Sequence, residues 1–339
     1  MHVQVPATSA NLGPGFDALG LALSLYDDLD VRITGSGLCI EIEGEGEELA
    51  AAGEGHLVVR ALRAGFAAFA DGGAQPPGLA LRCANRIPHG RGLGSSAAAI
   101  VGGLLAAQAL SALGNRPAPA LSGRTGTGRS APAEADLLTL ATELEGHPDN
   151  VAACLAGGLT IAWTTSQGPR LTRLEPIPDL YPVVCIAPSD VAVRTEVARK
   201  ALPETVPHRE AAANAGRAAL LIAALTQKES ASQLFDATED WLHQAYRSRA
   251  MPDTYALVTA LREDGLAAVV SGAGPSVLAL TTAKPGLDRL DSIVRETGKA
   301  WRISPLDVAR QGARVLHPPV GGPSRTPLLR DTDGCEGMP

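Results

Sequence analysis

A glycine-rich segment ahead of an apolar helix constrains this 339-residue chain more than any other feature. The segment reads IPHGRGLGSSAAAIVGG (residues 87–103) and follows an alternating, strand-like stretch at residues 78–83. Glycines allow close backbone approach, and the free N–H groups at a helix start bind anions without a side-chain cation. Because the Gly-Lys-Ser/Thr of the common P-loop is missing, the segment predicts a phosphate site built mainly from backbone groups. Taken alone, it is more typical of an ordinary loop and helix cap than of a phosphate site.

Two further glycine-punctuated loops lie far from this segment in the sequence. PATSANLGPGFDALG (residues 6–20) follows a short N-terminal strand, and SGAGPS (residues 271–276) joins two apolar strands. By itself, the last of these is typical of a tight turn. Three such loops in one chain favour a shared role in binding phosphate.

Strand and helix patterns follow one another in two blocks of the chain. Residues 57–69 place apolar side chains at helical spacing, whereas other short stretches alternate as half-buried strands do. The mixture predicts an α+β fold in two domains, residues 1–168 and 169–316. Residues 114–135 are rich in Gly, Pro, Ser and Thr and predict a flexible insertion; the similar composition of residues 317–339 predicts a disordered tail.

Composition excludes several classes of partner. The formal net charge is −7 without a basic run, which argues against nucleic acid and anionic membranes as partners. The N-terminus lacks the pattern of a signal peptide, and the most apolar stretch, residues 97–107, is too short to span a bilayer. The five cysteines contain no C-x-x-C pair and suit reduced thiols. We therefore expect a cytoplasmic protein that acts on small molecules.

The three glycine loops stand in order with two more motifs, EGHPDNVAACLAGG (residues 145–158) and LHQAYRSRAMP (residues 242–252). Together they resemble the motifs of the GHMP kinase superfamily, and the last two resemble its homoserine kinases in particular. The resemblance covers residues 1–316. It implies an N-terminal domain like ribosomal protein S5 domain 2 and a C-terminal ferredoxin-like domain. It also implies ATP and Mg²⁺ as cofactors, phosphorylation of the L-homoserine side-chain hydroxyl to O-phospho-L-homoserine for threonine biosynthesis, and a possible homodimer.

The resemblance assigns the ATP phosphates and the metal to particular residues. The predicted phosphate loop consists of Pro88, His89, Gly90, Arg91, Gly92, Leu93, Gly94, Ser95, Ser96, Ala97 and Ala98. Mg²⁺ prefers oxygen ligands and retains several waters, so one hydroxyl and one carboxylate suffice. By the resemblance these are Ser96 and Glu143. Glu145, in the same ELEG stretch, is the rival carboxylate, and a solvated helix carboxylate is the alternative for both.

An amino-acid substrate with a hydroxyl group needs a cation for its carboxylate and acceptors for its ammonium group. Arginine suits the carboxylate because its planar fork can donate two parallel hydrogen bonds. The resemblance assigns this task to Arg194 and Arg247, and it makes Asp17 the partner of the ammonium or hydroxyl group. Asn11, His147 and Asn150 complete the predicted pocket. Outside complete motifs, such residues are more typical of caps, turns and solvent-facing positions.

The residues expected to act in catalysis are Asp17, Asn150 and Arg194. Several superfamily relatives have an Asp that acts as the catalytic base near HPDN. Homoserine kinases have an Asn there instead, and the resemblance puts Asn150 of this chain in that position. Asp149 is therefore either a base or a helix cap. Without a base, catalysis would rest on proximity and electrostatic stabilisation. The loop at residues 271–276 is expected to brace the other two glycine loops.

Two other functions are compatible with these motifs. One is phosphorylation of mevalonate or a related alcohol, which would not need two arginines for an amino-acid carboxylate. The other is a non-catalytic relative that senses ATP and an amino acid. The presence of Ser96, Glu143 and Asp17 argues against the second function.

Overall fold

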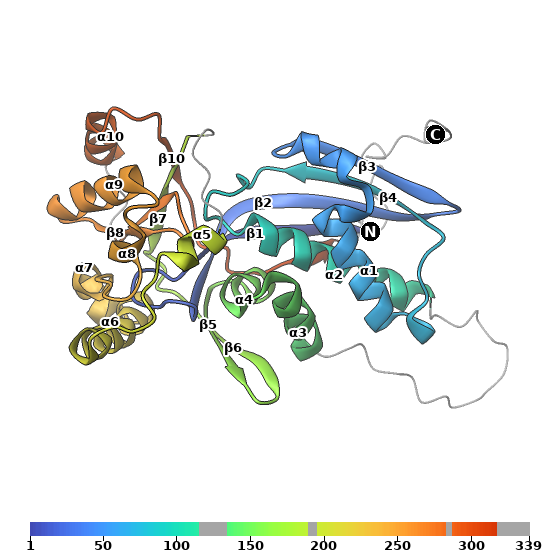
Figure 1. Cartoon of the computed structure of the whole chain (residues 1–339), viewed down its shortest axis with the longest axis horizontal. Coiled ribbons are helices and arrows are strands. Elements are labelled where there is room, and N and C mark those ends of the chain that lie inside the picture. Colours follow the sequence, from blue (N-terminus) through green and yellow to red (C-terminus); the bar gives the residue numbers. More distant parts are fainter. Residues whose placement is uncertain (115–133, 189–194, 283–286, 317–339) are drawn as a thin grey trace.

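Two sheets with their helices form the two ends of an elongated molecule (Figure 1). The computed structural model describes residues 1–114, 134–188, 195–282 and 287–316. Arg194, most of the predicted insertion and the whole predicted tail lie outside these described residues.

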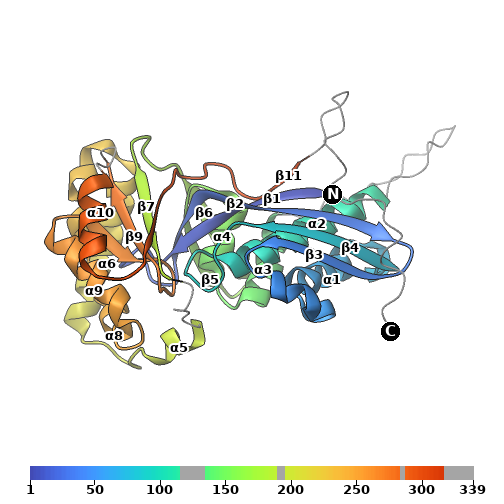
Figure 2. The ribbon, with the colours of Figure 1, turned by 90° about the horizontal axis from the view of Figure 1, so that it is seen from above.

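The first sheet contains the N-terminal strands. Its order is β11-β1-β2-β4-β3, and the β5-β6 hairpin attaches to β2. All of its pairs are antiparallel except the parallel pair β3 and β4. The strands are β1 (His2–Ala10), β2 (Leu19–Thr34), β3 (Gly37–Gly44), β4 (Gly78–Asn85), β5 (Leu159–Thr165), β6 (Gly168–Leu174) and β11 (Arg314–Leu316). Figure 2 shows β11, near the end of the described chain, beside β1.

Helices α1 to α4 cover one face of this sheet (Figure 1). The helices and 3₁₀ turns of this unit are η1 (Glu47–Gly55), α1 (Leu57–Phe69), η2 (Asp71–Gly73), α2 (Ser95–Gly114), α3 (Glu134–Glu145) and α4 (Pro148–Ala156). Glycines let α1 and α2 pack closely: a Cβ on Gly103 would lie 2.7 Å from Ala61 Cβ, and one on Gly65 would lie 2.6 Å from Ala107 Cβ. By length and composition alone α2 could span a membrane. Here it is packed against α1 and the sheet, as a core helix is.

The second unit has the expected ferredoxin-like arrangement. Its antiparallel sheet has the order β10-β7-β9-β8, so its four strands stand in the order 4-1-3-2. The strands are β7 (Tyr181–Ile186), β8 (Ala267–Val270), β9 (Val277–Thr281) and β10 (Arg302–Pro305). The helices are α5 (Thr195–Lys200), α6 (His208–Thr226), η3 (Lys228–Gln233), α7 (Leu234–Ala237), α8 (Gln244–Arg247), α9 (Pro252–Glu263) and α10 (Leu287–Glu296).

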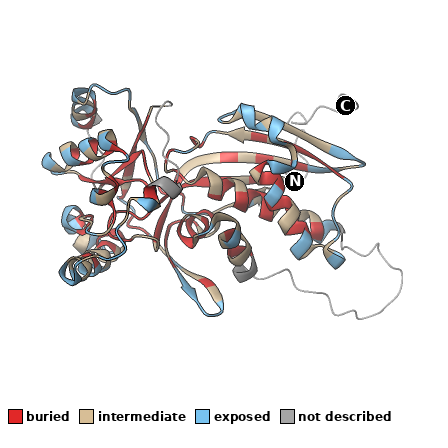
Figure 3. Cartoon of the chain, in the orientation of Figure 1, coloured by how far each residue is buried: buried red, intermediate tan, exposed pale blue. Residues whose placement is uncertain are grey.

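Buried side chains of the two units pack against each other in one hydrophobic cluster. One hydrophobic cluster includes Val5 and Leu81 of the first sheet together with Val184 and Leu278 of the second, and buried residues continue through the junction (Figure 3). The predicted boundary after residue 168 stays a prediction. By strand pairing, however, β6 and β11 belong to the first sheet, although β11 and all of β6 except Gly168 follow that boundary. The junction is therefore a built interface on which a site can form.

Candidate active site

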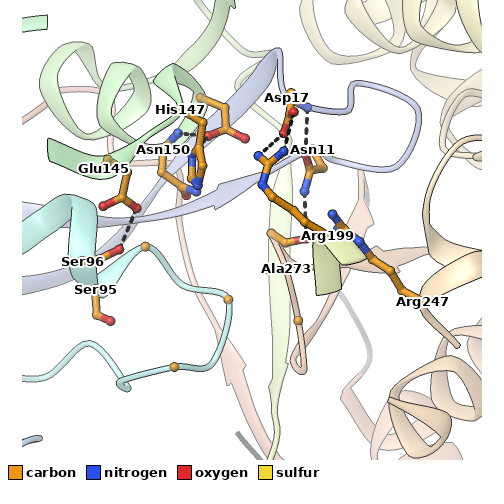
Figure 4. Close-up of a pocket in the computed structure, with 16 residues that line it drawn as sticks. Asn11, Asp17, Ser95, Ser96, Glu145, His147, Asn150, Arg199, Arg247 and Ala273 are labelled. Carbon is orange, nitrogen blue, oxygen red and sulfur yellow. Dashed lines mark hydrogen bonds and ion pairs between the residues drawn. The ribbon is translucent and has the colours of Figure 1, made fainter. Parts of the chain in front are cut away.

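A cavity between the two units collects most of the predicted site residues (Figure 4). It is lined by Asn11, Asp17, Gly90, Gly92, Gly94, Ser95, Ser96, Glu145, His147, Asp149, Asn150, Arg199, Arg247, Gly272, Ala273 and Gly274. These residues come from segments distributed along most of the described chain, so only the folded protein brings them together.

The central glycine loop leads into the N-terminus of α2, as the sequence predicts. Gly92 and Gly94 have φ of 69° and 68°, which glycine adopts without strain. A Cβ on Gly92 would lie 2.1 Å from the Ser271 carbonyl oxygen, and one on Gly94 would lie 2.0 Å from Thr8 Oγ1. Both glycines are therefore needed for close approach. The first N–H groups of α2 have no partner within the helix, which makes its start a suitable anion site.

The other two glycine loops hold this loop in place. Thr8 N–H donates to the Leu93 carbonyl at 3.0 Å, and Ser271 Oγ donates to the Gly92 carbonyl at 2.7 Å. Ser9 Oγ lies 2.8 Å from Ser271 Oγ. The expected bracing contacts are thus present. Glycines of the third loop line the cavity as well.

The predicted phosphate-loop residues separate into three groups. Gly90, Gly92, Gly94, Ser95 and Ser96 line the cavity. His89, Ser95, Ser96 and Ala98 line a neighbouring second cavity. Pro88, Arg91, Leu93 and Ala97 are buried and line neither. Ser95 and Ser96 therefore mark the passage between the two cavities.

Ser96 meets Glu145 rather than Glu143. Ser96 Oγ donates to Glu145 Oε1 at 2.6 Å, and Glu145 lines the cavity. Burial raises the pKa of Glu145, against the opposing effects of the Ser96 hydrogen bond and His147. Glu143 is exposed. Residues two apart on a helix point about 200° away from each other, so the two glutamates cannot face the same cavity.

The start of α4 contributes a hydrogen-bonded group of polar residues. His147 Nδ1 lies 2.8 Å from Asp149 Oδ1, and the same oxygen accepts the Asn150 backbone N–H at 2.7 Å. Asp149 raises the pKa of His147 against the opposing effect of burial. Thr8 Oγ1 donates to Asn150 Oδ1 at 2.8 Å. The Asp149 carboxylate is thus engaged by the first turn of its own helix, whereas the N-cap residue of α4 is His147 and makes no side-chain capping bond.

Asp17 is held by an arginine that the sequence reasoning missed. Arg199 of α5 donates to both carboxylate oxygens of Asp17, with N to O distances of 2.7 and 2.9 Å. The Asp17 backbone N–H donates to Asn11 Oδ1 at 3.0 Å, and Asn11 Nδ2 donates to the Gly272 carbonyl at 2.8 Å. Arg194, the predicted arginine of this stretch, lies just before α5 and outside the described residues. The only signal for Arg199 in the sequence is that it is a basic residue in the short segment that forms α5.

Arg247 is fixed deep at the same end of the cavity. Only 2% of it is exposed, and its Nε donates to the Ala198 carbonyl at 3.2 Å. Its guanidinium lies over the Phe16 ring, 5.2 Å from the ring centroid. Burial and the nearby Arg199 lower the pKa of Arg247, although a guanidinium stays charged in proteins. The cavity therefore has two cations and one carboxylate at one end (Figure 4).

The second cavity, with a volume of about 340 Å³, opens beside Ser95 and Ser96. Its walls are largely apolar and include Leu29, Leu49 and Val58. His56 occupies the N-cap position of α1 without capping it, and its buried Nδ1 has no hydrogen-bond partner. Burial lowers the pKa of His56, and His89 lowers it further. A largely apolar cavity of this kind is suited to a flat heterocyclic base.

A metal site is not evident from clustered ligands. Within the described ranges, no group of three or more His, Cys, Asp or Glu side chains is arranged to hold a metal ion. The Ser96 hydroxyl and Glu145 carboxylate still supply hard oxygen donors beside the phosphate-binding helix start. This donor set fits Mg²⁺, which takes few protein ligands where phosphates and waters complete its shell.

Comparison with known proteins gives two family matches. Residues 56–158 match the model described as GHMP kinases N terminal domain, and residues 209–301 match the one described as GHMP kinases C terminal. Both matched ranges lie in the two units described above, and the first contains the central glycine loop.

Relatives and solved structures agree with these matches. The chain is 52% identical to the homoserine kinase of Streptomyces coelicolor, covering 93% of this chain and 94% of the relative. It is 49% identical to that of Clavibacter michiganensis, covering 93% of each. A crystal structure of homoserine kinase from Cytophaga hutchinsonii superposes with a TM-score of 0.74 at 26% identity, over 93% of this chain and 97% of that one. A mevalonate kinase from L. major, at 16% identity and a TM-score of 0.64, covers 91% of this chain and 96% of its own, and shares the fold.

Proposed function

The chain belongs to the homoserine kinases of the GHMP kinase family, and we propose that it transfers the γ-phosphoryl group of ATP to the side-chain hydroxyl of L-homoserine. The product is O-phospho-L-homoserine, an intermediate of threonine biosynthesis. The observation that carries this proposal is the charge layout of the cavity. An anion-binding helix start lies at one end, and a carboxylate with two arginines lies at the other.

The phosphates of ATP bind at the glycine loop and the start of α2. Backbone N–H groups and the helix dipole neutralise part of their charge without a lysine. The base occupies the second cavity, because Ser95 and Ser96 line both cavities and a nucleotide must pass there. His56 lines this cavity and lies beside the base.

Ser96 and Glu145 would hold Mg²⁺, which needs few protein ligands where phosphates and waters are present. We place Glu145 in the role that the sequence assigned to Glu143, because Glu145 reaches Ser96 and the cavity. A bound ion would supply neutralisation of the charge on the phosphates. Burial raises the pKa of Glu145. A buried carboxylate of this kind is suited to binding a cation.

Homoserine binds with its charged groups at the arginine end of the cavity. Arg199 and Arg247 receive its carboxylate, and Asp17 receives its ammonium group. Asn11 fixes Asp17, and His147 and Asn150 lie between this end and the phosphate loop. The substrate hydroxyl is thereby directed toward the γ-phosphate. Arg194 remains a candidate of the sequence alone.

The polar groups near the reacting hydroxyl favour catalysis without a strong base. Asn150 accepts from Thr8 through Oδ1, which leaves its NH₂ group to donate to a substrate oxygen. Asp149 Oδ1 already accepts from Asn150 N–H and contacts His147. Positioning and electrostatic stabilisation then supply the rate enhancement. If kcat of the Asp149→Asn variant fell by many orders of magnitude while substrate binding was unchanged, Asp149 would have to act as a general base.

The substrate assignment is tested by an ADP-release assay with a panel of acceptors. Purified protein with ATP and Mg²⁺ should release ADP with L-homoserine, and far more slowly with serine, threonine or mevalonate. Preference for mevalonate would overturn the amino-acid assignment, and ATP binding without ADP release would indicate a sensor. Phosphorus NMR of the product should show a phosphate monoester.

A homodimer and a cytoplasmic location remain proposals. The buried thiols Cys83, Cys154 and Cys185 suit a reducing compartment, because none of them forms a disulfide. Light scattering after size exclusion tests the dimer, and cell fractionation tests the location.

A further inference from the structure

We propose that His243 is a positioning residue that fixes the two charged poles of the amino-acid site relative to each other. This inference rests on the proposed function, since it concerns how the same substrate is held. His243 is fully buried just before α8 and contacts both Arg247 and the loop that carries Asp17. It does not line the cavity itself.

Its contact with Arg247 determines which imidazole nitrogen carries the proton. Arg247 Nη1 lies 3.3 Å from His243 Nδ1. A guanidinium can only donate hydrogen bonds, so Nδ1 must be the unprotonated acceptor. The proton of the neutral ring therefore resides on Nε2. Burial lowers the pKa of His243 and favours this neutral ring, against the opposing effect of Asp240.

The Nε2 proton is used on the opposite side of the ring. Nε2 lies 2.8 Å from the Gly13 carbonyl oxygen and donates to it. Gly13 belongs to a loop in which Asn11, Leu12 and Asp17 all have positive φ, between 51° and 69°. Such non-glycine conformations cost energy and persist only where surrounding contacts enforce them. His243 is one of those contacts.

Few other contacts share this task. Asn214 Nδ2 donates to the Pro14 carbonyl at 2.8 Å, and the His243 ring stacks on Phe16 with centroids 5.0 Å apart. The imidazole touches the Asp17 loop on one side and Arg247 on the other. Helix α5 makes a second link, because Arg199 binds Asp17 and the Ala198 carbonyl accepts from Arg247. The ring hydrogen-bonds to both poles and therefore helps to set the separation of the ammonium pole and the carboxylate pole. A substrate whose ammonium and carboxylate groups lie at a different separation would therefore bind less tightly.

Two substitutions separate the two contacts. In His243→Asn the shorter amide falls near the position of Nδ1, so it can accept from Arg247 but does not reach Gly13. In His243→Gln the longer amide falls near Nε2, so it can donate to Gly13 but leaves Arg247 without its acceptor. Exposed His208, at the start of α6, provides matched control variants, His208→Asn and His208→Gln.

Substrate fragments measure each pole separately. 4-Hydroxybutyrate carries the carboxylate without the ammonium group, and 3-aminopropan-1-ol carries the ammonium group without the carboxylate. His243→Gln should weaken binding of 4-hydroxybutyrate about tenfold and spare 3-aminopropan-1-ol; His243→Asn should do the reverse. Both variants should raise KM for homoserine about tenfold while KM for ATP changes less than about threefold. The His208 variants should change none of these values.

Each outcome distinguishes this proposal from the proposed function. If the wild type neither binds homoserine nor releases ADP with it, the proposed function fails. If the wild type is active but both His243 variants weaken the two fragments equally, the residue is merely structural and the proposal is overturned. Nitrogen-15 chemical shifts of the wild-type ring need no variant. They should report the neutral Nε2–H form at pH 7, and a proton on Nδ1 would overturn the proposal.

Discussion

Ser96 Oγ donates a 2.6 Å hydrogen bond to Oε1 of Glu145, although the two residues are 49 positions apart in the sequence. The contact joins the start of α2 to the last residue of α3 at the edge of the cavity. Because burial raises the pKa of Glu145, its ionised form opposes folding at neutral pH. A carboxylate kept in such a place has a role that outweighs its effect on stability.

Glu145→Gln should therefore separate activity from stability. Mg²⁺-dependent turnover should fall by about two orders of magnitude or more, as expected when a charge-stabilising group is removed. The Tm at pH 7.5 should rise slightly, and the gain should disappear below about pH 4, where both states of the wild type bind the proton. Glu143→Gln is the control and should keep wild-type turnover across a Mg²⁺ titration. A larger loss in Glu143→Gln than in Glu145→Gln would return the metal to Glu143.

Arg199→Met should raise KM for homoserine at least tenfold, because the carboxylate of the substrate loses a charge-assisted hydrogen bond. The ion pair with Asp17 is about one-third exposed on both sides, so its loss should cost little stability. KM for ATP should change less than about threefold. Arg194→Met is the matched comparison within the same stretch of sequence. If it has the larger effect on KM for homoserine, the carboxylate role belongs to Arg194.

The sequence predicts the fold and the meeting of the glycine loops because these depend on local requirements. Gly92 and Gly94 must adopt positive φ and approach other backbone closely, and few other residue types can do so. The spacing of apolar residues likewise indicates the strands, by alternation, and the helices, by recurrence every three to four residues. The α+β class and the ferredoxin-like second unit are confirmed. The place of β6 in the first sheet depends on its hairpin with β5, which the boundary prediction did not use.

The choice between neighbouring candidates could not be read from the sequence. Glu143 and Glu145 share one short stretch, and only the packing of α3 decides which of them faces the cavity. The same holds for Arg199, whose direction depends on where α5 begins. His243 gives no sequence signal for its role, because one of its two partners, Gly13, lies 230 positions away in the sequence. Tertiary packing thus determines what local pattern leaves open.

His56→Leu and His56→Gln should test the base site. Leucine fills similar space without a polar atom, so KM for ATP should rise about tenfold when one hydrogen bond is lost. Glutamine keeps a polar group at about the length of the imidazole Nε2, so KM for ATP should stay within about threefold. The leucine variant should also lose any preference for ATP over purine riboside triphosphate, which lacks the amino group. KM for homoserine is the internal control. Equal behaviour of the two variants would exclude His56 from base recognition.

Asp27→Asn should stabilise the protein in a pH-dependent manner. Asp27 is 8% exposed, and its Oδ1 accepts the backbone N–H groups of Arg86 and Ile87, which an asparagine oxygen can also do. Burial raises the pKa of Asp27 to about 6, against the opposing effects of these two N–H groups.

The sign of this dependence follows from proton binding. Between about pH 4 and pH 6 the folded state holds the Asp27 proton more tightly than the unfolded state, so this residue's contribution to stability is lost as pH rises. The gain of Asp27→Asn over wild type should therefore grow from near zero at pH 4 to about 1–3 kcal/mol above pH 6.5 in urea unfolding. Asp28→Asn is the control, because Asp28 pairs with Arg86 at 2.6 Å and its removal should give no gain. A gain for Asp27→Asn that is constant or shrinks with rising pH would contradict the raised pKa.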